Sequence, residues 1–154
     1  MKYDVLTTDP AGMDTSLATA EDGTCSMTAT QLLTDLGITH ETDVPLAPMT
    51  WYGVGGKAQC LAKPADEAEL AKLMQGCNEQ GIPVRILGSG ANLLVSDDGV
   101  DGVVVKLEHE SFSQMSIEGT TVTVGAGYDL AKLVLDTARA GLAGLEVLAG
   151  IPAS

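Results

Sequence analysis

Residues 85–95 read Arg85-Ile86-Leu87-Gly88-Ser89-Gly90-Ala91-Asn92-Leu93-Leu94-Val95, two short apolar runs joined by a glycine loop. The apolar runs predict two strands, at 84–87 and 93–95. Glycines at positions 88 and 90 allow positive φ, so successive backbone N–H groups can point the same way and form an anion-binding nest. Ser89 and Asn92 add side-chain donors. From this local chemistry the loop is either a phosphate nest or an ordinary glycine-rich turn.

The two common nucleotide-binding motifs do not fit this loop. A dinucleotide fingerprint needs a third glycine where Leu93 stands, and a helix after the loop, whereas residues 93–95 favour a strand. A Walker loop needs Gly-Lys followed by Ser or Thr, and no lysine follows these glycines. Any phosphate site here therefore belongs to another class.

Two further glycine clusters follow along the chain, Gly125-Ala126-Gly127 and Gly150-Ile151-Pro152. The first precedes a helix expected at about 129–140, and small residues before a helix N-terminus suit close approach of a phosphate-bearing ligand. Asp129 either weakens an anion site there or simply caps the helix. Three glycine-rich turns that all follow apolar elements favour one extended ligand over three unrelated turns.

The stretch after Pro64 predicts an amphipathic helix. Asp66 is a good N-cap and Glu69 stands three residues on, as in a capping box. The apolar stripe at i, i+3, i+4 and i+7 comprises Leu70, Leu73, Met74 and Cys77. Gly81 ends the helix. Because Cys77 lies on this stripe, it is interpreted as a core residue rather than as a nucleophile.

The pattern along the chain divides it into four segments. Residues 1–27 lack periodicity and are predicted to be an unstructured acidic tail, and residues 28–45 a short helix with a proline-stiffened linker. Residues 46–110 carry the strands and helix of a first α/β unit. Residues 111–154 begin a second unit with a hairpin around Gly119 and then a helix. The predicted inner face of that helix comprises Leu130, Leu133, Val134 and Ala138.

Composition excludes several classes of protein. The 154 residues are 45% hydrophobic with a mean hydropathy of +0.18, enough to bury a core. A net charge of −13 disfavours binding to nucleic-acid duplexes, and 3% aromatic residues disfavour a single-strand platform. Three widely spaced cysteines and two distant histidines indicate neither a disulfide framework nor a metal site. No apolar leader or run of about 18 apolar residues occurs, so a cytoplasmic protein without a membrane partner is expected.

Four blocks of sequence carry a resemblance to a known family. They are Thr50-Trp-Tyr-Gly-Val-Gly-Gly, the glycine loop at 85–95, Gly125-Ala-Gly, and the stretch from Gly141 to the end of the chain, which closes on Gly-Ile-Pro-Ala-Ser. In this order and spacing residues 46–154 resemble the N-terminal, FAD-binding part of the UDP-N-acetylenolpyruvoylglucosamine reductases. The family's usual loop has a glycine and a serine where Ser89 and Ala91 stand, and a glycine where Ala153 stands.

The resemblance implies an α+β fold of the vanillyl-alcohol oxidase and p-cresol methylhydroxylase type, with a complete first subdomain and a truncated second one. It implies FAD held between the two, with the loop at 88–94 around its pyrophosphate. It also implies that NADPH, through the flavin, reduces UDP-N-acetylglucosamine enolpyruvate to UDP-N-acetylmuramate for peptidoglycan synthesis. The implied cofactor-binding residues are Leu87, Gly88, Ser89, Gly90, Ala91, Asn92, Leu93, Leu94, Gly125, Ala126, Gly127, Gly150, Ile151, Pro152 and Ser154.

No residue of the chain matches a catalytic position of that family, so the 154-residue chain alone is expected to be inactive. Glu146, beside a turn, is interpreted as structural rather than as a general acid. Two alternatives stay open: a non-catalytic module that binds no flavin, and another flavin oxidase of the same superfamily.

Two physical consequences follow from this interpretation. Gly90→Val is expected to weaken FAD binding roughly several hundred-fold, because a branched side chain would stand where the backbone approaches the phosphates. The second unit is expected to leave an unpaired edge and an uncovered apolar helix face. Residues 50–107 should therefore be better ordered than residues 113–154.

Overall fold

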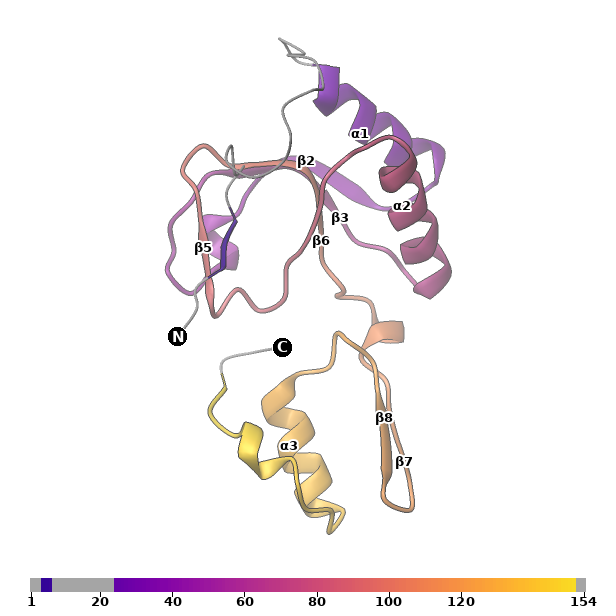
Figure 1. Cartoon of the computed structure of the whole chain (residues 1–154), viewed down its shortest axis with the longest axis vertical. Coiled ribbons are helices and arrows are strands. Elements are labelled where there is room, and N and C mark those ends of the chain that lie inside the picture. Colours follow the sequence, from indigo (N-terminus) through magenta and orange to yellow (C-terminus); the bar gives the residue numbers. More distant parts are fainter. Residues whose placement is uncertain (1–3, 7–23, 152–154) are drawn as a thin grey trace.

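A four-stranded mixed sheet forms the centre of the first of two lobes in this computed structural model, which describes residues 4–6 and 24–151 (Figure 1). The strands lie in the order β2 (His40–Pro45), β3 (Lys57–Ala62), β6 (Val100–Val105) and β4 (Val84–Ile86). Strand β2 is antiparallel to β3, whereas β3, β6 and β4 are parallel to one another. The chain therefore crosses over after β3 and inserts β6 between β3 and β4.

Two helices cover one face of this sheet, α1 (Thr24–Asp35) and α2 (Glu67–Glu79), and Figure 1 shows them side by side. Their apolar side chains meet alternate residues of the strands, because side chains of a strand point to opposite faces in turn. The buried cluster on this face comprises Ala29, Leu32, Leu33, Ile38, Cys60, Ala62, Leu73, Cys77, Ile82, Val103 and Val105. Cys77 is thus a core residue, as its place on the apolar stripe predicts.

The opposite face of the sheet is covered by the 3₁₀ turn η1 (Ala47–Met49) and by β5 (Leu93–Val95). Strand β5 pairs in parallel with β1 (Asp4–Leu6) in a separate two-stranded sheet. The second buried cluster comprises Val44, Leu46, Ala58, Leu61, Leu87, Val95, Val100 and Val104. Burial on both faces explains why the central strand β6 ends in a continuous apolar run.

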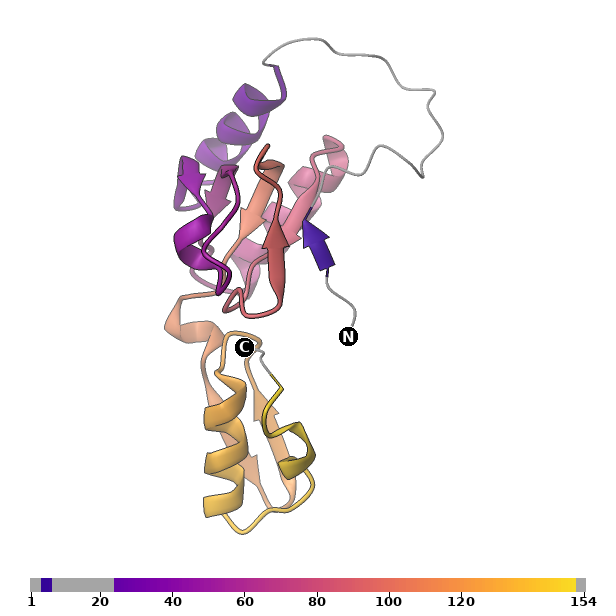
Figure 2. The ribbon, with the colours of Figure 1, turned by 90° about the vertical axis from the view of Figure 1, so that its left-hand side faces the viewer.

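The second lobe contains the hairpin of β7 (Met115–Glu118) and β8 (Thr121–Val124), with α3 (Leu130–Arg139) alongside (Figure 2). Both views place this lobe at one end of the first, beyond the 3₁₀ turn η2 (Glu110–Phe112). A last short turn, η3 (Glu146–Leu148), follows α3. The hairpin turn and the helix are those that the sequence predicts.

The start of α2 confirms the predicted capping residues. The Asp66 carboxylate accepts a hydrogen bond of 2.8 Å from the Glu69 backbone N–H. The Glu69 carboxylate in turn accepts one of 2.8 Å from the Ala65 N–H, one residue before the cap. Gly81 follows the end of the helix with φ of +66°. Local signals are sufficient here because every partner lies within a few residues.

The predicted linker within residues 28–45 is wrong, because His40–Pro45 is the edge strand β2, paired with β3 from His40↔Ala62 to Pro45↔Lys57. Proline is tolerated at such an edge because one side of the strand needs no ladder hydrogen bonds. Leu46, directly after the strand, is fully buried. The first lobe therefore begins before residue 46 and includes α1.

The predicted unstructured tail, residues 1–27, is wrong in two places. Asp4–Leu6 is strand β1, and helix α1 begins at Thr24, four residues before the predicted start. Each residue of this strand pairs with a residue of β5 that lies 89 positions further along the chain, such as Val95 for Leu6, so no local pattern predicts the strand. The remainder of this stretch lies outside the described residues.

Two predicted inner-face residues are also exposed. Met74 on α2 is 44% exposed, while Leu73 and Cys77 carry the contact with the sheet. On α3, Ala138 is exposed and its neighbour Thr137 is buried instead. The Thr137 hydroxyl donates to the Leu133 carbonyl at 2.8 Å, which satisfies it within the helix.

Candidate functional site

A cavity of about 360 Å³ lies where the two lobes meet. Its volume is at the lower end of the range for small-molecule sites. Loops that follow β4 and β6 of the first lobe form one wall. Ser113, after η2, and the turn before α3 form the other. The lining residues are Ile86, Leu87, Gly88, Ser89, Lys106, Leu107, Glu108, Ser113, Ala126 and Gly127.

The sheet places this cavity at the carboxyl ends of two neighbouring parallel strands. Ile86 at the end of β4 pairs with Val105 at the end of β6. The Leu87 N–H donates to the Val105 carbonyl at 2.9 Å, so the glycine loop leaves the sheet directly beside Lys106. Crevices outside the carboxyl ends of parallel strands are where open α/β sheets bind ligands.

Several backbone N–H groups of the glycine loop make no hydrogen bond to a carbonyl of the described residues. Gly90 adopts φ of +69°, the left-handed conformation that a nest uses, whereas Gly88 is not among the described residues with positive φ. In the described part of the chain, the N–H groups of Gly88, Gly90 and Ala91 donate to no carbonyl. Gly88 and Ser89 are exposed and line the cavity. The exposed Gly88 N–H is therefore accessible from the cavity, and anion binding by this loop stays a prediction.

The second glycine cluster packs the turn before α3 against η2. A Cβ on Gly125 would overlap the Phe112 carbonyl, and one on Gly127 would lie 2.5 Å from the Leu107 carbonyl oxygen. The Gly127 N–H donates to the Phe112 carbonyl at 2.9 Å. The glycines therefore permit close approach of two backbones, and the exposed Ala126 between them reaches the cavity.

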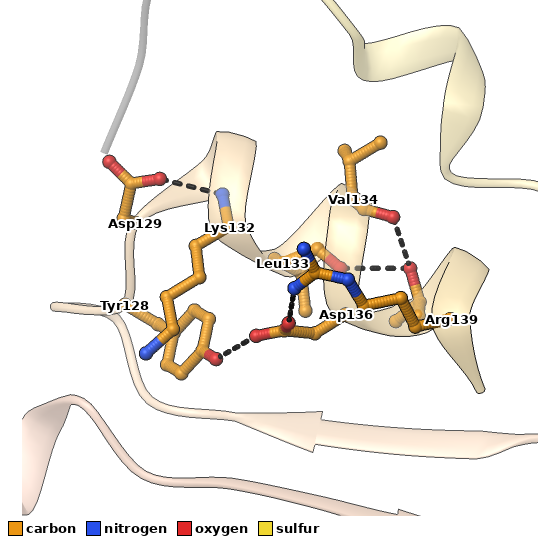
Figure 3. A network of polar contacts seen from close by, with 8 residues as sticks. Tyr128, Asp129, Lys132, Leu133, Val134, Asp136 and Arg139 are labelled. Atoms are coloured by element: carbon orange, nitrogen blue, oxygen red, sulfur yellow. Dashed lines mark hydrogen bonds and ion pairs between the residues drawn. The ribbon is translucent and has the colours of Figure 1, made fainter.

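The helix after this turn carries its own cap and a polar network (Figure 3). The Asp129 carboxylate accepts from the Lys132 N–H at 2.7 Å, so this aspartate caps α3, one of the two expectations from the sequence. The Tyr128 hydroxyl donates to Asp136 at 2.7 Å, and Arg139 donates to the other oxygen of Asp136 at 3.1 Å. The hydrogen bond with Tyr128 lowers the pKa of Asp136 and raises the pKa of Tyr128.

A cluster of charged residues, absent from the sequence prediction, borders the cavity. Lys106 Nζ lies 2.6 Å from Glu108 Oε1, and Lys63 Nζ lies 3.4 Å from Glu108 Oε2 and 3.1 Å from Glu41 Oε1. The hydrogen bond from Lys106 lowers the pKa of Glu108, and that from Lys63 to Glu41 raises the pKa of Lys63. The signal in the sequence that could have indicated this cluster is a lysine directly after an apolar strand, Lys63 after β3 and Lys106 after β6.

The structure brings together five of the fifteen predicted cofactor residues. Those that line the cavity are Leu87, Gly88, Ser89, Ala126 and Gly127. Leu87 is only 2% exposed as a whole residue and packs in the second buried cluster. Leu93 packs on the same core cluster, while Leu94 is 41% exposed on β5.

The third predicted cluster does not reach the cavity in the described structure. Gly150 and Ile151 are exposed and absent from its lining. Pro152 and Ser154 lie outside the described residues. Of the three glycine clusters that were expected to contact one ligand, two contribute residues to the cavity.

Several other expectations concern single groups. The Glu146 carboxylate is exposed and accepts the N–H of Gly144 and of its own residue, and these hydrogen bonds lower its pKa; its structural role stays a prediction. Among the described residues no group of three or more His, Cys, Asp and Glu side chains is arranged to hold a metal ion. None of the helices in the described ranges is long and apolar enough to cross a membrane. Cys60 and Cys77 are buried free thiols.

Comparison of the sequence with known proteins matches residues 58–154 to the family described as FAD binding domain. The UDP-N-acetylenolpyruvoylglucosamine reductase of Azorhizobium caulinodans is 46% identical over 110 residues, which cover 71% of this chain and 35% of that protein. The enzyme of the same name from Heliobacterium modesticaldum is also 46% identical, with the same coverage. The chain thus spans about a third of the length of the curated relatives that it matches.

Comparison with solved structures also indicates a reductase-like FAD binding domain. The crystal structure of UDP-N-acetylenolpyruvylglucosamine reductase from Thermus caldophilus is similar with a TM-score of 0.56 and 40% identity, over 75% of this chain and 38% of that one. A berberine bridge enzyme variant is similar with a TM-score of 0.54 at 16% identity, over 74% of this chain and 26% of its own, which shows the fold alone. The chain therefore belongs to the FAD binding domain family and is a reductase-like member of it, with the α+β fold of the vanillyl-alcohol oxidase and p-cresol methylhydroxylase type.

Proposed function

We propose that this chain binds FAD at the cavity between its lobes, with the pyrophosphate on the loop of residues 88–92. The observation that carries the proposal is the start of the glycine loop in the cavity wall, where Gly88 and Ser89 are exposed and the Gly88 N–H donates to no carbonyl among the described residues. Backbone donors bind phosphate without any net positive charge on the protein, which suits a chain with a net charge of −13.

The residues present fit such a ligand. Small residues on both walls, the exposed Gly88 and Ser89 on one and the exposed Ala126 and half-buried Gly127 on the other, leave room for a phosphate-bearing chain to pass between the lobes. Apolar groups at Ile86 and Leu107 suit the uncharged parts of a dinucleotide. When bound, FAD supplies hydride transfer, and the chain's own residues bind and orient it.

We further propose that the complete protein reduces UDP-N-acetylglucosamine enolpyruvate to UDP-N-acetylmuramate with NADPH. The similarity to reductases of that name, at 46% identity, supports this activity. The chain spans about a third of those proteins, and no residue of it is assigned a catalytic role. The 154-residue chain alone is therefore proposed to bind the cofactor without turning over substrate.

A cavity-filling variant tests the cofactor proposal. Ala126→Trp places a large side chain in the cavity, whereas Ala71→Trp adds the same side chain to the exposed surface of α2, distant in sequence from every lining residue. FAD is titrated into the unaltered chain and both variants, with flavin fluorescence as the readout and circular dichroism as the folding check. We expect A126W to weaken binding at least about tenfold and A71W to leave it unchanged. Equal FAD affinity in a folded A126W variant would exclude this cavity, and absence of FAD binding by the unaltered chain would favour a flavin-free module.

A further inference from the structure

A row of alternating charges, Glu41–Lys63–Glu108–Lys106, leads to the cavity and ends there on a cation. Each neighbouring pair is in contact, at 3.1, 3.4 and 2.6 Å along the row. Lys106 and Glu108 line the cavity, and Lys63 and Glu41 do not. Of the described residues, Lys106 is the only cationic one in the lining.

The sheet fixes the position of Lys106 beside the glycine loop. Lys106 follows β6, and its N–H donates to the Ala62 carbonyl of β3 at 2.9 Å. On the other side, the Leu87 N–H donates to the Val105 carbonyl at 2.9 Å, immediately before Gly88. Lys63 follows β3 in the same way. The first residues after the adjacent parallel strands β3, β6 and β4 are Lys63, Lys106 and Leu87, and of these Lys106 and Leu87 line the cavity.

Burial makes this charge effective. The Lys106 side chain is 24% exposed, so its field is less screened by solvent than that of a free surface lysine. Glu108 would repel an anion at the same place, but both of its oxygens are held by lysines, Oε1 by Lys106 and Oε2 by Lys63. Because Lys63 and Lys106 together neutralise the Glu108 carboxylate, that carboxylate repels an anion in the cavity less. An anionic ligand in the cavity would therefore extend the row of alternating charges beyond Lys106.

We propose that Lys106 contacts the diphosphate of a nucleotide bound in this cavity, and that Lys63 positions it by holding Glu108. The inference rests on the proposed binding of a dinucleotide at this site. It adds a side-chain cation to the backbone N–H of Gly88 in the cavity wall. Two ligands share the diphosphate, a flavin dinucleotide and a UDP-sugar, and the experiment treats them separately.

Four variants of the full chain test this assignment: K106M, K106R, K63M and the double variant K63M/E108Q. K72M is the matched control, because Lys72 is an exposed lysine on α2 that does not line the cavity. Each protein is titrated with FAD and with UDP-N-acetylglucosamine at low and high salt. Circular dichroism and thermal melting verify folding.

We expect K106M to weaken FAD binding at least about tenfold at low salt, with a smaller salt dependence, since one charge-assisted contact is lost. K106R should stay within about threefold of the unaltered chain and K72M should match it, because both keep a cation at the site. K63M should weaken binding through the freed Glu108 carboxylate. The double variant K63M/E108Q should restore it, which a merely structural role of Lys63 would not produce.

The outcomes separate this inference from the proposal on which it rests. Equal FAD affinity in K106M and K72M overturns the role of Lys106 and leaves FAD binding standing. Binding of UDP-N-acetylglucosamine that depends on Lys106, without binding of FAD, supports the diphosphate contact and overturns the cofactor proposal. Binding of neither ligand by the unaltered chain overturns both.

Discussion

The carbonyl oxygen of Met49 occupies the space that a Cβ on Gly90 would need. The same two segments are joined by a hydrogen bond of 3.1 Å from the Trp51 N–H to the Gly90 carbonyl. Gly90 is buried between them with φ of +69°. The loop at 88–92 is therefore held against the chain after η1, and substitution of Gly90 disturbs the fold before it reports on any ligand.

This packing predicts a large loss of stability in Gly90→Ala. Gly119 in the hairpin turn provides the control, because its φ is +61° but nothing lies within 4 Å of the added Cβ. Gly119→Ala should cost about 1–2 kcal/mol, the strain of a left-handed alanine alone. Gly90→Ala should cost at least about 2 kcal/mol more, because backbone must also move. Urea unfolding measures both, and equal losses would show that the Met49 contact relaxes freely.

The cap of α2 predicts a smaller, local effect. Asp66→Ala removes the acceptor for the Glu69 N–H and should cost about 1 kcal/mol of unfolding free energy. Asp66→Asn keeps an acceptor at the N-cap and should retain most of the stability. Urea denaturation of the two variants provides the comparison. A loss in Asp66→Asn as large as that in Asp66→Ala would assign the effect to charge rather than to the cap.

The ion pairs of Glu108 predict a stability difference that depends on pH. Its folded pKa is lowered, mainly by the hydrogen bond from Lys106, so its contribution is present above its unfolded pKa of about 4.3. That contribution is lost as pH falls through the lower folded pKa. Since the side chain is 45% exposed, Glu108→Gln should cost at most about 1 kcal/mol at pH near 7.

The Glu108→Gln difference is measured by urea unfolding at a series of pH values from neutral to acid. It should begin to shrink as pH falls below the unfolded pKa and reach zero below the lower folded pKa, where Glu108 is uncharged in both states. Glu118→Gln, at an exposed site in β7, is the control and should show little difference at any pH. A Glu108→Gln difference that grows on acidification would contradict the assignment of the ion pairs.

The network in Figure 3 predicts an altered tyrosine titration. The hydrogen bond to Asp136 raises the pKa of Tyr128 above its usual value of about 10. Asp136→Asn should bring that titration to lower pH, because the neighbouring negative charge is removed. Tyrosinate absorbance reports the titration, in a background where Tyr3 and Tyr52 are replaced by phenylalanine. An unchanged titration of Tyr128 would show that this hydrogen bond does not persist in solution.

The two lobes should differ in hydrogen exchange. Central strands of the first lobe contain fully buried residues, whereas beyond Phe112 the one buried residue among those described is Thr137. An apolar groove of about 610 Å³ remains open between the hairpin and α3. Amides of β7, β8 and α3 should therefore exchange at least about tenfold faster than those of β3 and β6. Uniform protection of both lobes would contradict this.

Local signals in the sequence determined those parts whose partners lie nearby. The cap at Asp66, the stop at Gly81 and the cap at Asp129 each depend on contacts within four residues. The glycine loop at 88–92 was also recognisable, because few residues adopt positive φ. Its order relative to three other blocks was sufficient to indicate the family.

Only the tertiary structure decided which distant segments meet. The pairing of β1 with β5, the burial of Leu46 and the use of β2 as an edge strand depend on residues far away in the chain. The contact of Met49 with Gly90 likewise gives that glycine a packing role that a local pattern does not contain.

The same distinction applies to the candidate site. The apolar run at 84–87 predicted the strand that leads into Gly88, but not the neighbours of that strand in the sheet. The parallel order β3-β6-β4 brings the residues that follow these strands into one row, because the carboxyl ends of parallel strands share an edge. Contacts across tens of residues depend on the free energy of the whole fold, and no short window of sequence contains them.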